Sequence, residues 1–446
     1  MEGSKTPVCD FVEGYAAGRP LRLHMPGHKG LGEAERLDIT EIQGADPLYA
    51  DRGVLKKCAN NAAALFGSGR SLLSAEGSSL CVRAMVALAR LRAKSEGLPP
   101  VILAGRNAHR TFLSAAALMG MEVVFLPAEG LLTCRPTPRA LREALERLPA
   151  PPAAVYLTSP DYLGHLADIA GLAPVCHERG VPLLVDNAHG AYLRFLPEDR
   201  HPLSLGADLV CDSAHKTLPA LTGAAWLHLG HSAPALFLRE ADRAMGMFAS
   251  TSPSWLILQS LDRCQGRLME GSLRRELADF AEKNAALKRR LEARGFALRG
   301  EEPLKITLAP KGFGYTGDHL HDLLRERGIE CEFSDPDFLV MMVAPATGED
   351  GLARLEDALA AVPRKAPIPE EAPPLPPAER ALGLREAMLS PAEILPAENS
   401  AGRILADPCV SCPPAVPIVL IGERITPEAI RCFRYYGIDR VSCVAE

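Results

Sequence analysis

The sequence predicts an α/β protein with a mostly parallel sheet, and two observations carry that prediction. Short, continuously apolar runs recur through the centre of the chain, and stretches with helical spacing and charged outer faces separate them. Strands that helices cover on both faces show such continuous apolar runs. The length of 446 residues corresponds to about three domains.

Five apolar runs are expected to form strands, at residues 101–104, 122–126, 153–157, 182–186 and 207–211. Helical patterns lie at residues 80–94, 138–147 and 172–179. A sheet of this kind binds ligands beyond the carboxyl ends of its strands. Functional residues are therefore expected directly after the apolar runs.

The pattern divides the chain into a large domain, a smaller α/β domain and a C-terminal domain. The charged, helical segment 262–294 would lead out of the large domain, which is predicted for residues 1–290. The smaller domain, 291–364, would hold helices at 318–327 and 351–361 and a strand at 338–344. Six prolines between residues 365 and 377 predict an extended linker, 365–378, before the C-terminal domain, 379–446.

Composition excludes several classes of protein. Hydrophobic residues make up 47% and charged residues 23%, which is the balance of a globular protein and excludes disorder or a coiled coil as a whole. The formal charge of −6 gives no basic excess that would indicate a nucleic-acid binder. No apolar stretch reaches the roughly 18 residues of a membrane span, and no signal peptide is evident. We therefore expect a cytoplasmic protein with reduced thiols.

The sequence predicts no metal site. Twelve cysteines are present, but Cys409 and Cys412 form a lone CxxC pair without the second pair that a structural zinc ion would need. His24 and His28 have the i, i+4 spacing of a helical metal pair. Pro26 and Gly27 stand between them, and these residues would break such a helix.

Lys216 is the first residue that points to chemistry. It lies just past an expected strand and beside Ser213 and His215. A buried lysine is costly unless it is neutral, paired or used covalently. A desolvated lysine of lowered pKa is the group that forms a Schiff base. Taken alone, however, an ordinary surface lysine in a loop is the simpler interpretation.

Asp186 ends another expected strand, thirty positions before Lys216. An aspartate at that place can hold a proton on a pyridine nitrogen, which makes the ring an electron sink. By itself it would equally fit a turn or a helix cap. Together, in this order, Asp186 and Lys216 favour pyridoxal 5'-phosphate as the cofactor.

Two weaker signals agree with that cofactor. Ser78 and Ser79 open a helical run, where backbone N–H groups bind a phosphate well, although serine is also a common helix cap. His109 follows the strand at 101–104, and its ring could stack on the cofactor. A lone histidine there would otherwise be a plain loop residue.

At the level of whole motifs, the chain resembles the Orn/Lys/Arg decarboxylases, which are fold type I, pyridoxal-phosphate-dependent enzymes of the transferase-like fold. It looks like the short form of that family, which starts directly at the catalytic core. The matching stretches run nearly end to end and are Leu23 to Gly30, Asp38 to Glu41 with Asp46, Arg106 to His109, Val185 to Gly190, Ser213 to Pro219, Thr251 to Ser254, and Pro413 to Thr426.

The resemblance implies a role for each candidate residue. Catalytic roles would fall to Lys216 as the Schiff-base lysine, Asp186 on the pyridine nitrogen, His109 stacked on the ring and His189 close to the cofactor. Glu423 would pair with the distal cation of the substrate. The remaining cofactor contacts would come from Ser78, Ser79, Ser213 and His215 at the phosphate and from Thr251 and Ser252, which would reach the cofactor of a neighbouring subunit.

That last implication makes a homodimer the minimal active unit. The implied reaction is decarboxylation of arginine, lysine or ornithine to the corresponding amine. The short form and the near-neutral isoelectric point favour polyamine biosynthesis over acid resistance.

Some residues depart from the family pattern. Leu80 and Cys81 stand where small residues are usual in the phosphate loop, and Asn187 replaces a usual acidic residue. Cys412 and Ala415 replace a usual Tyr and Gly. These departures leave Lys216, Asp186 and His109 in place, but they bear on substrate and activity.

Two alternatives stay open. The same lysine and aspartate serve other fold type I enzymes, such as an aminotransferase or a lyase acting on another amino acid. A non-catalytic, cofactor-binding regulator is the alternative from a different class. A dinucleotide-binding oxidoreductase is disfavoured, because no GxGxxG motif joins a first strand to a helix.

Overall fold

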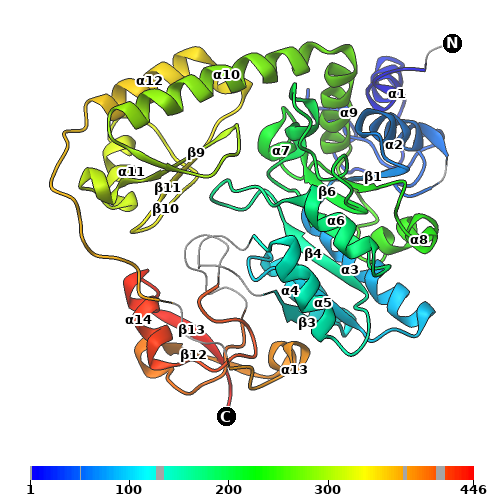
Figure 1. Ribbon diagram of the computed structural model, residues 1–446. Helices are drawn as coiled ribbons and strands as arrows, with labels where there is room; N and C mark the ends of the chain where they lie inside the picture. The colour runs from blue at the N-terminus through cyan, green and yellow to red at the C-terminus, as the bar shows by residue number, and fades with distance from the viewer. Residues whose placement is uncertain (1–2, 51, 127–134, 375–378, 408–416) are drawn as a thin grey trace. The chain divides into compact units, whose positions relative to one another are not determined.

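The computed structural model describes residues 3–50, 52–126, 135–374, 379–407 and 417–446 (Figure 1). Two compact units make up the chain. Unit 1 comprises Met1–Leu98, Ala153–Val155 and Ile169–Ala278, and unit 2 comprises Pro99–Pro152, Tyr156–Asp168 and Asp279–Glu446. Among the described residues, no helix has both the length and the apolar character needed to cross a membrane.

The main sheet has seven strands in the order β1-β7-β6-β5-β4-β2-β3. Parallel pairs include β2 with β3 and β5 with β6, whereas β7 runs antiparallel to both of its neighbours. The predicted α/β class with a mostly parallel sheet is therefore confirmed. The strands are β1 Arg70–Ser74, β2 Val101–Ala104, β3 Glu122–Phe125, β4 Ala154–Thr158, β5 Leu183–Asp186, β6 Leu209–Ser213 and β7 Ala225–Leu229.

In unit 1, helices pack on strands that are almost wholly buried. Helix α3 contacts β1, β6 and β7, and large side chains such as Trp226, Trp255 and Phe66 fill the core. The helices of this unit are α1 Pro7–Ala17, α2 Gly53–Phe66, α3 Gly77–Glu96, α6 Ile169–His177, α7 Ala214–Thr217, α8 Ala235–Gly246 and α9 Trp255–Glu270, with 3-10 turns η1 Glu35–Leu37 and η2 Ala191–Phe195.

Unit 2 contains β2, β3 and two further sheets of its own. The first has the order β10-β11-β9-β8, and α11 contacts two of its strands. It is built from β8 Ala297–Arg299, β9 Lys305–Ala309, β10 Phe333–Ser334 and β11 Leu339–Met342, with η3 Pro310–Phe313, α11 Gly317–Arg325, η4 Pro345–Thr347 and α12 Gly348–Ala360 (Figure 1). Helices α4 Arg110–Met119 and α5 Pro138–Arg147 accompany β2 and β3.

The C-terminal part of unit 2 has a small core around Leu405, Ile425 and Phe433. A two-stranded antiparallel sheet pairs β12 with β13. The elements of this part are α13 Leu384–Leu389, β12 Ala392–Pro396, η5 Ala397–Asn399, α14 Pro427–Tyr435 and β13 Arg440–Val444. The predicted domain limits at residues 290, 364 and 378 stay predictions.

The predicted helical segment 262–294 is two helices rather than one. Helix α9 ends at Glu270, and α10 Ser272–Ala293 begins two residues later. Gly271 stands between them with φ +80°, a left-handed conformation that ends a helix and that glycine adopts without strain. The helical period of the sequence continues through Gly271, and so it could not show whether this glycine ends a helix or lies within one.

One strand end differs from the prediction in a way that matters for the site. The strand expected at 207–211 is β6, Leu209–Ser213, and so Asp212 and Ser213 belong to the strand. Both residues pair with β7, opposite Trp226 and Ala225. The pattern did not predict β7, and without that partner the last residues of β6 look like a loop.

Candidate functional site

Lys216 lies in a single helical turn directly after β6. The turn is α7, Ala214–Thr217, and Ser213 is its N-cap residue. The Lys216 side chain is exposed, and its Nζ lies 3.0 Å from Nε2 of the buried His189. Because His189 follows β5, the structure brings a lysine amine and an imidazole together from two neighbouring strand ends.

Asp186 is the last residue of β5 and is only 4% exposed. Its Oδ1 accepts hydrogen bonds from the Ala188 N–H at 3.1 Å and from Cys211 Sγ at 3.4 Å. Burial, together with the nearby Asp186 carboxylate, raises the pKa of the Cys211 thiol well above its usual range, so this thiol stays protonated and can donate. The arrangement keeps a carboxylate buried at the carboxyl end of the strand.

Ser213 and the start of α3 provide the groups expected of a phosphate site. Ser213 Oγ is buried and has no hydrogen-bond partner in the part of the chain that the structure describes. A buried hydroxyl without a partner is costly, so a ligand oxygen at this place would be favourable. Ser78 and Ser79, both half-buried, lie in the first turn of α3, where N–H groups point outward.

Gly77 allows the chain to enter α3 at this point. Its φ is +71°, and a Cβ at Gly77 would meet nothing within 4 Å. The glycine is therefore required by the backbone conformation and not by crowding. Its N–H donates to the Gly223 carbonyl at 2.7 Å, which anchors the turn.

His215 is half-buried and neutral in this setting. Burial lowers its pKa, and Nδ1 donates to the Ala224 carbonyl at 3.0 Å. With the single proton on Nδ1, Nε2 has none to donate. A phosphate dianion beside the ring would raise this pKa again, so the predicted phosphate contact requires His215 to take up a proton when the anion binds.

Thr251 and Ser252 are exposed and lie in the loop between α8 and α9. The Ser252 N–H donates to Ser250 Oγ at 3.1 Å, and the Ser250 N–H donates to Glu76 Oε1 at 2.7 Å. The loop is thus tied to the residue that precedes α3. Their predicted contact with the cofactor of another subunit stays a prediction.

His109 belongs to unit 2 and is the N-cap residue of α4. Its Nδ1 accepts a hydrogen bond from the Thr111 N–H at 3.2 Å. That bond places the proton of a neutral ring on Nε2, and the side chain is exposed. Its predicted role on the cofactor ring stays a prediction.

Glu423 also belongs to unit 2, and sequence reasoning missed its partner. Arg106 donates to both carboxylate oxygens of Glu423, at 2.9 and 3.0 Å, and the Leu420 N–H donates to Oε2 at 2.6 Å. The side chains of Arg106 and Glu423 are 16% and 7% exposed. If Glu423 binds the distal cation of a substrate, that cation must take the place of Arg106. The sequence contains both residues in matched stretches, but no spacing signal joins positions so far apart.

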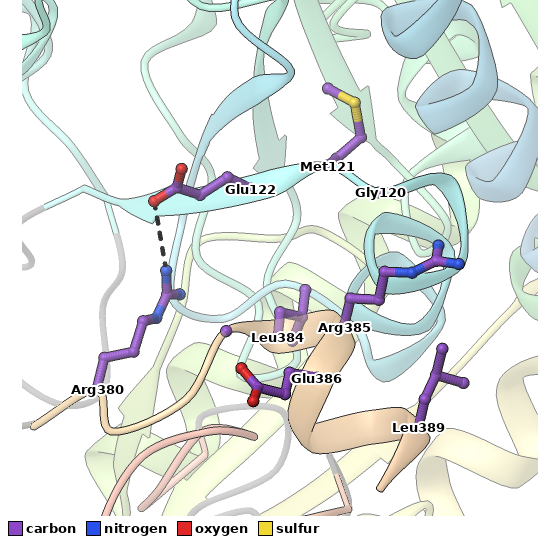
Figure 2. A pocket seen from close by; sticks show the side chains of 9 residues that line it. Gly120, Met121, Glu122, Arg380, Leu384, Arg385, Glu386 and Leu389 are labelled. Atoms are coloured by element: carbon purple, nitrogen blue, oxygen red, sulfur yellow. Dashed lines mark ion pairs between the residues drawn. The ribbon is translucent and has the colours of Figure 1, made fainter.

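A separate groove lies between α13 and the start of β3 (Figure 2). Its volume is about 620 Å³, and its lining includes Glu122, Arg380, Arg385 and Glu386. Arg385 donates to the carbonyls of Ala117 and Leu118 at the end of α4. Arg380 donates to the Val123 carbonyl and lies 4.0 Å from Glu122. Both arginines therefore serve to attach the C-terminal segment, and we assign no ligand to the groove.

The departures from the family pattern now have locations. Leu80 and Cys81 are fully buried on the inner face of α3, so their side chains fill the core and do not replace phosphate contacts. Burial raises the pKa of Cys81 strongly, and the carboxylates of Asp212 and Asp186 add to that effect. Asn187 donates to Asp212. Cys412 and Ala415 lie outside the described residues.

The two histidines that were set aside as a metal pair have separate partners. His24 Nε2 lies 2.5 Å from the Tyr15 hydroxyl, and His28 Nε2 lies 3.3 Å from Asp38 Oδ2.

Comparison with known proteins identifies the family. The family model for the major domain of the Orn/Lys/Arg decarboxylases matches residues 6–310. The uncharacterized protein YaaO of Bacillus subtilis (strain 168) is 30% identical, over 96% of this chain and 93% of that protein. The arginine decarboxylase of Bacillus anthracis is 30% identical, over 96% of this chain and 92% of that protein.

A solved structure agrees with the fold. The lysine decarboxylase LdcF of Francisella novicida matches with a TM-score of 0.80 at 16% identity, over 99% of this chain and 81% of that one. The chain belongs to the Orn/Lys/Arg decarboxylase family, and with it to the pyridoxal-phosphate-dependent amino-acid decarboxylases.

Proposed function

We propose that this protein decarboxylates a basic amino acid, arginine, lysine or ornithine, with pyridoxal 5'-phosphate held at Lys216. The observation that carries the proposal is the contact between Lys216 Nζ and His189 Nε2 at 3.0 Å, beside the buried Asp186, in a chain of this family. Relatives named arginine decarboxylase support the substrate class.

The residues of unit 1 fit the cofactor in kind. When bound, pyridoxal phosphate supplies an aldehyde that condenses with an amine and a ring that takes up the electron pair left when carbon dioxide departs. Lys216 Nζ is the amine to which it would be held. Asp186 would keep the ring nitrogen protonated, since a buried carboxylate gains from a nearby positive charge. His109 would stack on the ring.

Phosphate binding would use hydroxyls and helix N-termini. Ser213 Oγ lacks a partner among the described residues, and Ser78 and Ser79 open α3. His215 would join them after taking up a proton. Thr251 and Ser252 would complete the site of a second subunit, which makes a homodimer the proposed minimal unit.

Proton transfer would fall to Lys216 and His189. Replacement of a carboxylate by hydrogen needs one proton at the α-carbon of the substrate. Lys216 Nζ and His189 Nε2 lie within hydrogen-bond distance, so one proton can pass between them. Either nitrogen is therefore able to deliver the proton while the other holds its replacement.

Glu423 is the proposed partner of the distal cation. A buried guanidinium or ammonium must be paired, and Glu423 is already arranged to bind a guanidinium, that of Arg106. The substrate cation would exchange with Arg106 in this proposal.

The test is a competition assay. Purified protein with added pyridoxal phosphate would receive arginine, lysine and ornithine together, and mass spectrometry would quantify agmatine, cadaverine and putrescine. One dominant amine is expected from the wild type and none from Lys216→Ala. Lys283→Ala, which changes a partly exposed lysine on α10 paired with Asp279 and Glu349, should keep the wild-type rate. No amine from cofactor-loaded protein would contradict the proposal and favour another substrate or a non-catalytic role.

A further inference from the structure

A buried polar network lies on the face of the β5–β6 pair opposite to Asp186. Successive residues of a strand point to opposite faces, and Asp186 is paired with Cys211 on one of them. The next residues, Asn187 and Asp212, therefore extend to the other face. Asn187 Nδ2 donates to Asp212 Oδ1 at 2.5 Å, and both residues are 0% exposed.

The second oxygen of Asp212 faces two imidazoles. His201 Nε2 donates to Asp212 Oδ2 at 2.9 Å, and His228 Nε2 lies 3.2 Å away without the alignment of a hydrogen bond. The His201 proton is on Nε2, because Nδ1 accepts from the Leu203 N–H. His228 Nδ1 lies 2.7 Å from Ser71 Oγ, so the network reaches from β5 across β6 and β7 to β1.

The charge of Asp212 determines the chemistry at position 187. Burial would raise the pKa of Asp212, but His201 and His228 hold it well below its usual range, so the group is a carboxylate. A carboxylate only accepts hydrogen bonds, so its neighbour at 2.5 Å must donate. The amide of Asn187 can do this, whereas an ionised acid at the same position would bring two anions into contact.

The segments at the ends of β5 and β6, residues 186–189 and 212–216, are also joined by a second contact, on the side of the proposed cofactor. Asn187 directly follows Asp186 and precedes His189 by two residues, while Asp212 directly precedes Ser213 and lies four residues before Lys216. The His189–Lys216 contact connects these segments on one side and the Asn187–Asp212 bond on the other. A shift of either buried residue would therefore move the groups proposed to hold the cofactor.

We propose that Asn187 and Asp212 act as a matched amide–carboxylate pair that positions Asp186 and Lys216 for the cofactor. The inference rests on the proposed function, because the positioned groups are those of the cofactor site. The negative charge of this pair stands on β6, at Asp212, where it faces His201 and His228.

Exchange of the two side chains gives the sharpest test. Asn187→Asp alone places two carboxylates together, and Asp212→Asn alone removes the anion that faces His201. The double variant restores one amide and one carboxylate, with the amide now on β6, where it can donate to the new acid and accept from His201. The readouts are the visible absorption band of the bound cofactor, the affinity for pyridoxal phosphate, and chemical unfolding of the cofactor-free protein.

We expect each single variant to lose about tenfold or more in cofactor affinity and to shift the absorption band, whereas the double variant returns to within about threefold of the wild type. If the single variants do not fold, recovery of folded protein with the wild-type band in the double variant supports the inference. Single variants with unchanged band and affinity, or a double variant as impaired as the sum of both, would overturn it.

Asp208→Asn is the matched control, because Asp208 is a buried aspartate directly before β6 that contacts His177 and Ser232. This change should lower stability and leave the band and the affinity unchanged; a shifted band in this control would also overturn the inference. A wild-type protein that shows no cofactor band at all would contradict both the inference and the proposed function, whereas a wild-type band without rescue would contradict the inference alone.

Discussion

At both ends of the β5–β6 pair, a buried aspartate contacts a histidine and the neighbouring segment, but the consequences differ. At the amino end, Asp208 Oδ2 accepts from the Leu183 N–H at 2.8 Å and contacts His177 at 2.9 Å, while Oδ1 accepts from Ser232 at 2.7 Å. At the carboxyl end, Asp212 accepts from Asn187 and His201. Each end thus joins the two strands through a buried aspartate and an imidazole.

What differs is the sequence that continues from each end. The chain before Asp208, at residues 201–206, forms turns and carries none of the proposed cofactor residues. Beyond Asp212 and Asn187 lie Ser213, Lys216 and His189, the proposed site. Strand pairing needs a stabilising contact at both ends, but only at the carboxyl end can a change in that contact alter chemistry. The proposed site thus lies where α/β sheets bind their ligands, at the carboxyl ends of the strands.

The largest effect should come from Asp186→Asn at the carboxyl end. An amide cannot hold the ring nitrogen in its protonated form as a carboxylate does, so the rate should fall by about 10² or more while the fold persists. Steady-state kinetics and a circular dichroism spectrum would measure the two quantities. Asp208→Asn should leave the rate near that of the wild type, and a fast Asp186→Asn enzyme would refute the electron-sink role.

A second substitution tests Glu423 in unit 2, whose partner Arg106 follows the carboxyl end of β2. Glu423→Gln should raise KM for the basic amino acid about tenfold or more, because one partner of a buried charge pair is removed. Cofactor affinity should stay the same, and both quantities come from titrations of one preparation. If KM stays the same and cofactor affinity falls, the role of Glu423 is to hold Arg106 and thereby the loop that carries His109. The substrate cation then binds elsewhere.

Serine substitutions at the two ends separate phosphate binding from stability. Ser213→Ala removes a buried hydroxyl that lacks a partner among the described residues, so cofactor affinity should fall by about tenfold. Ser232→Ala removes a donor to Asp208 and should leave that affinity unchanged. Fluorescence titration with pyridoxal phosphate measures both, and equal losses in the two variants would argue against a phosphate contact at Ser213.

A third buried aspartate, Asp335 in unit 2, differs from Asp212 in how its pKa is shifted, and this difference predicts how stability depends on pH. Burial raises the pKa of Asp335 to about 7, against hydrogen bonds from the N–H groups of Phe338 and Asp337, and the carboxylates of Asp337 and Asp318 raise it further. Since the folded state holds this proton more tightly than the unfolded state, its contribution is fully present below the unfolded pKa of 3.8 and is lost as pH rises to about 7.

The measurement is denaturant unfolding at several pH values between these limits. As pH rises, the free energy of unfolding should decline more steeply in the wild type than in Asp335→Asn. Identical pH profiles for the two proteins would show that Asp335 ionises normally in the folded state. No comparable loss is expected from Asp212, because its pKa is lowered by neighbouring imidazoles.

Much of the fold could be predicted, and the failures share a cause. Five strands of the main sheet, each with an apolar run at its centre, were predicted near their observed places, whereas β1 and β7 were missed. Arg70, Ser71 and Ser74 interrupt the apolar run of β1, and His228 interrupts that of β7. Ser71 and His228 are buried because they extend the polar network of Asp212, a contact between distant positions that local patterns cannot show.

The site divides in the same way. Lys216, Asp186 and the serines of α3 could be predicted, because their significance depends on position relative to a strand or a helix. The Arg106–Glu423 pair and the Asn187–Asp212 bond could not, since they depend on tertiary packing and on which face of a strand a residue occupies. In the sequence, Asn187 stood out only as a departure from the family pattern. The structure shows its partner, Asp212, because Asp212 belongs to β6.

The most direct test of the central claim is to locate the cofactor on the chain. Protein loaded with pyridoxal phosphate would be reduced with borohydride, digested and mapped by mass spectrometry. The account predicts a pyridoxyl group on the peptide that contains Lys216, with loss of the visible band in Lys216→Ala and its retention in Lys283→Ala. A pyridoxyl group on another lysine, or none on any, would contradict the assignment of the site on which the proposed function rests.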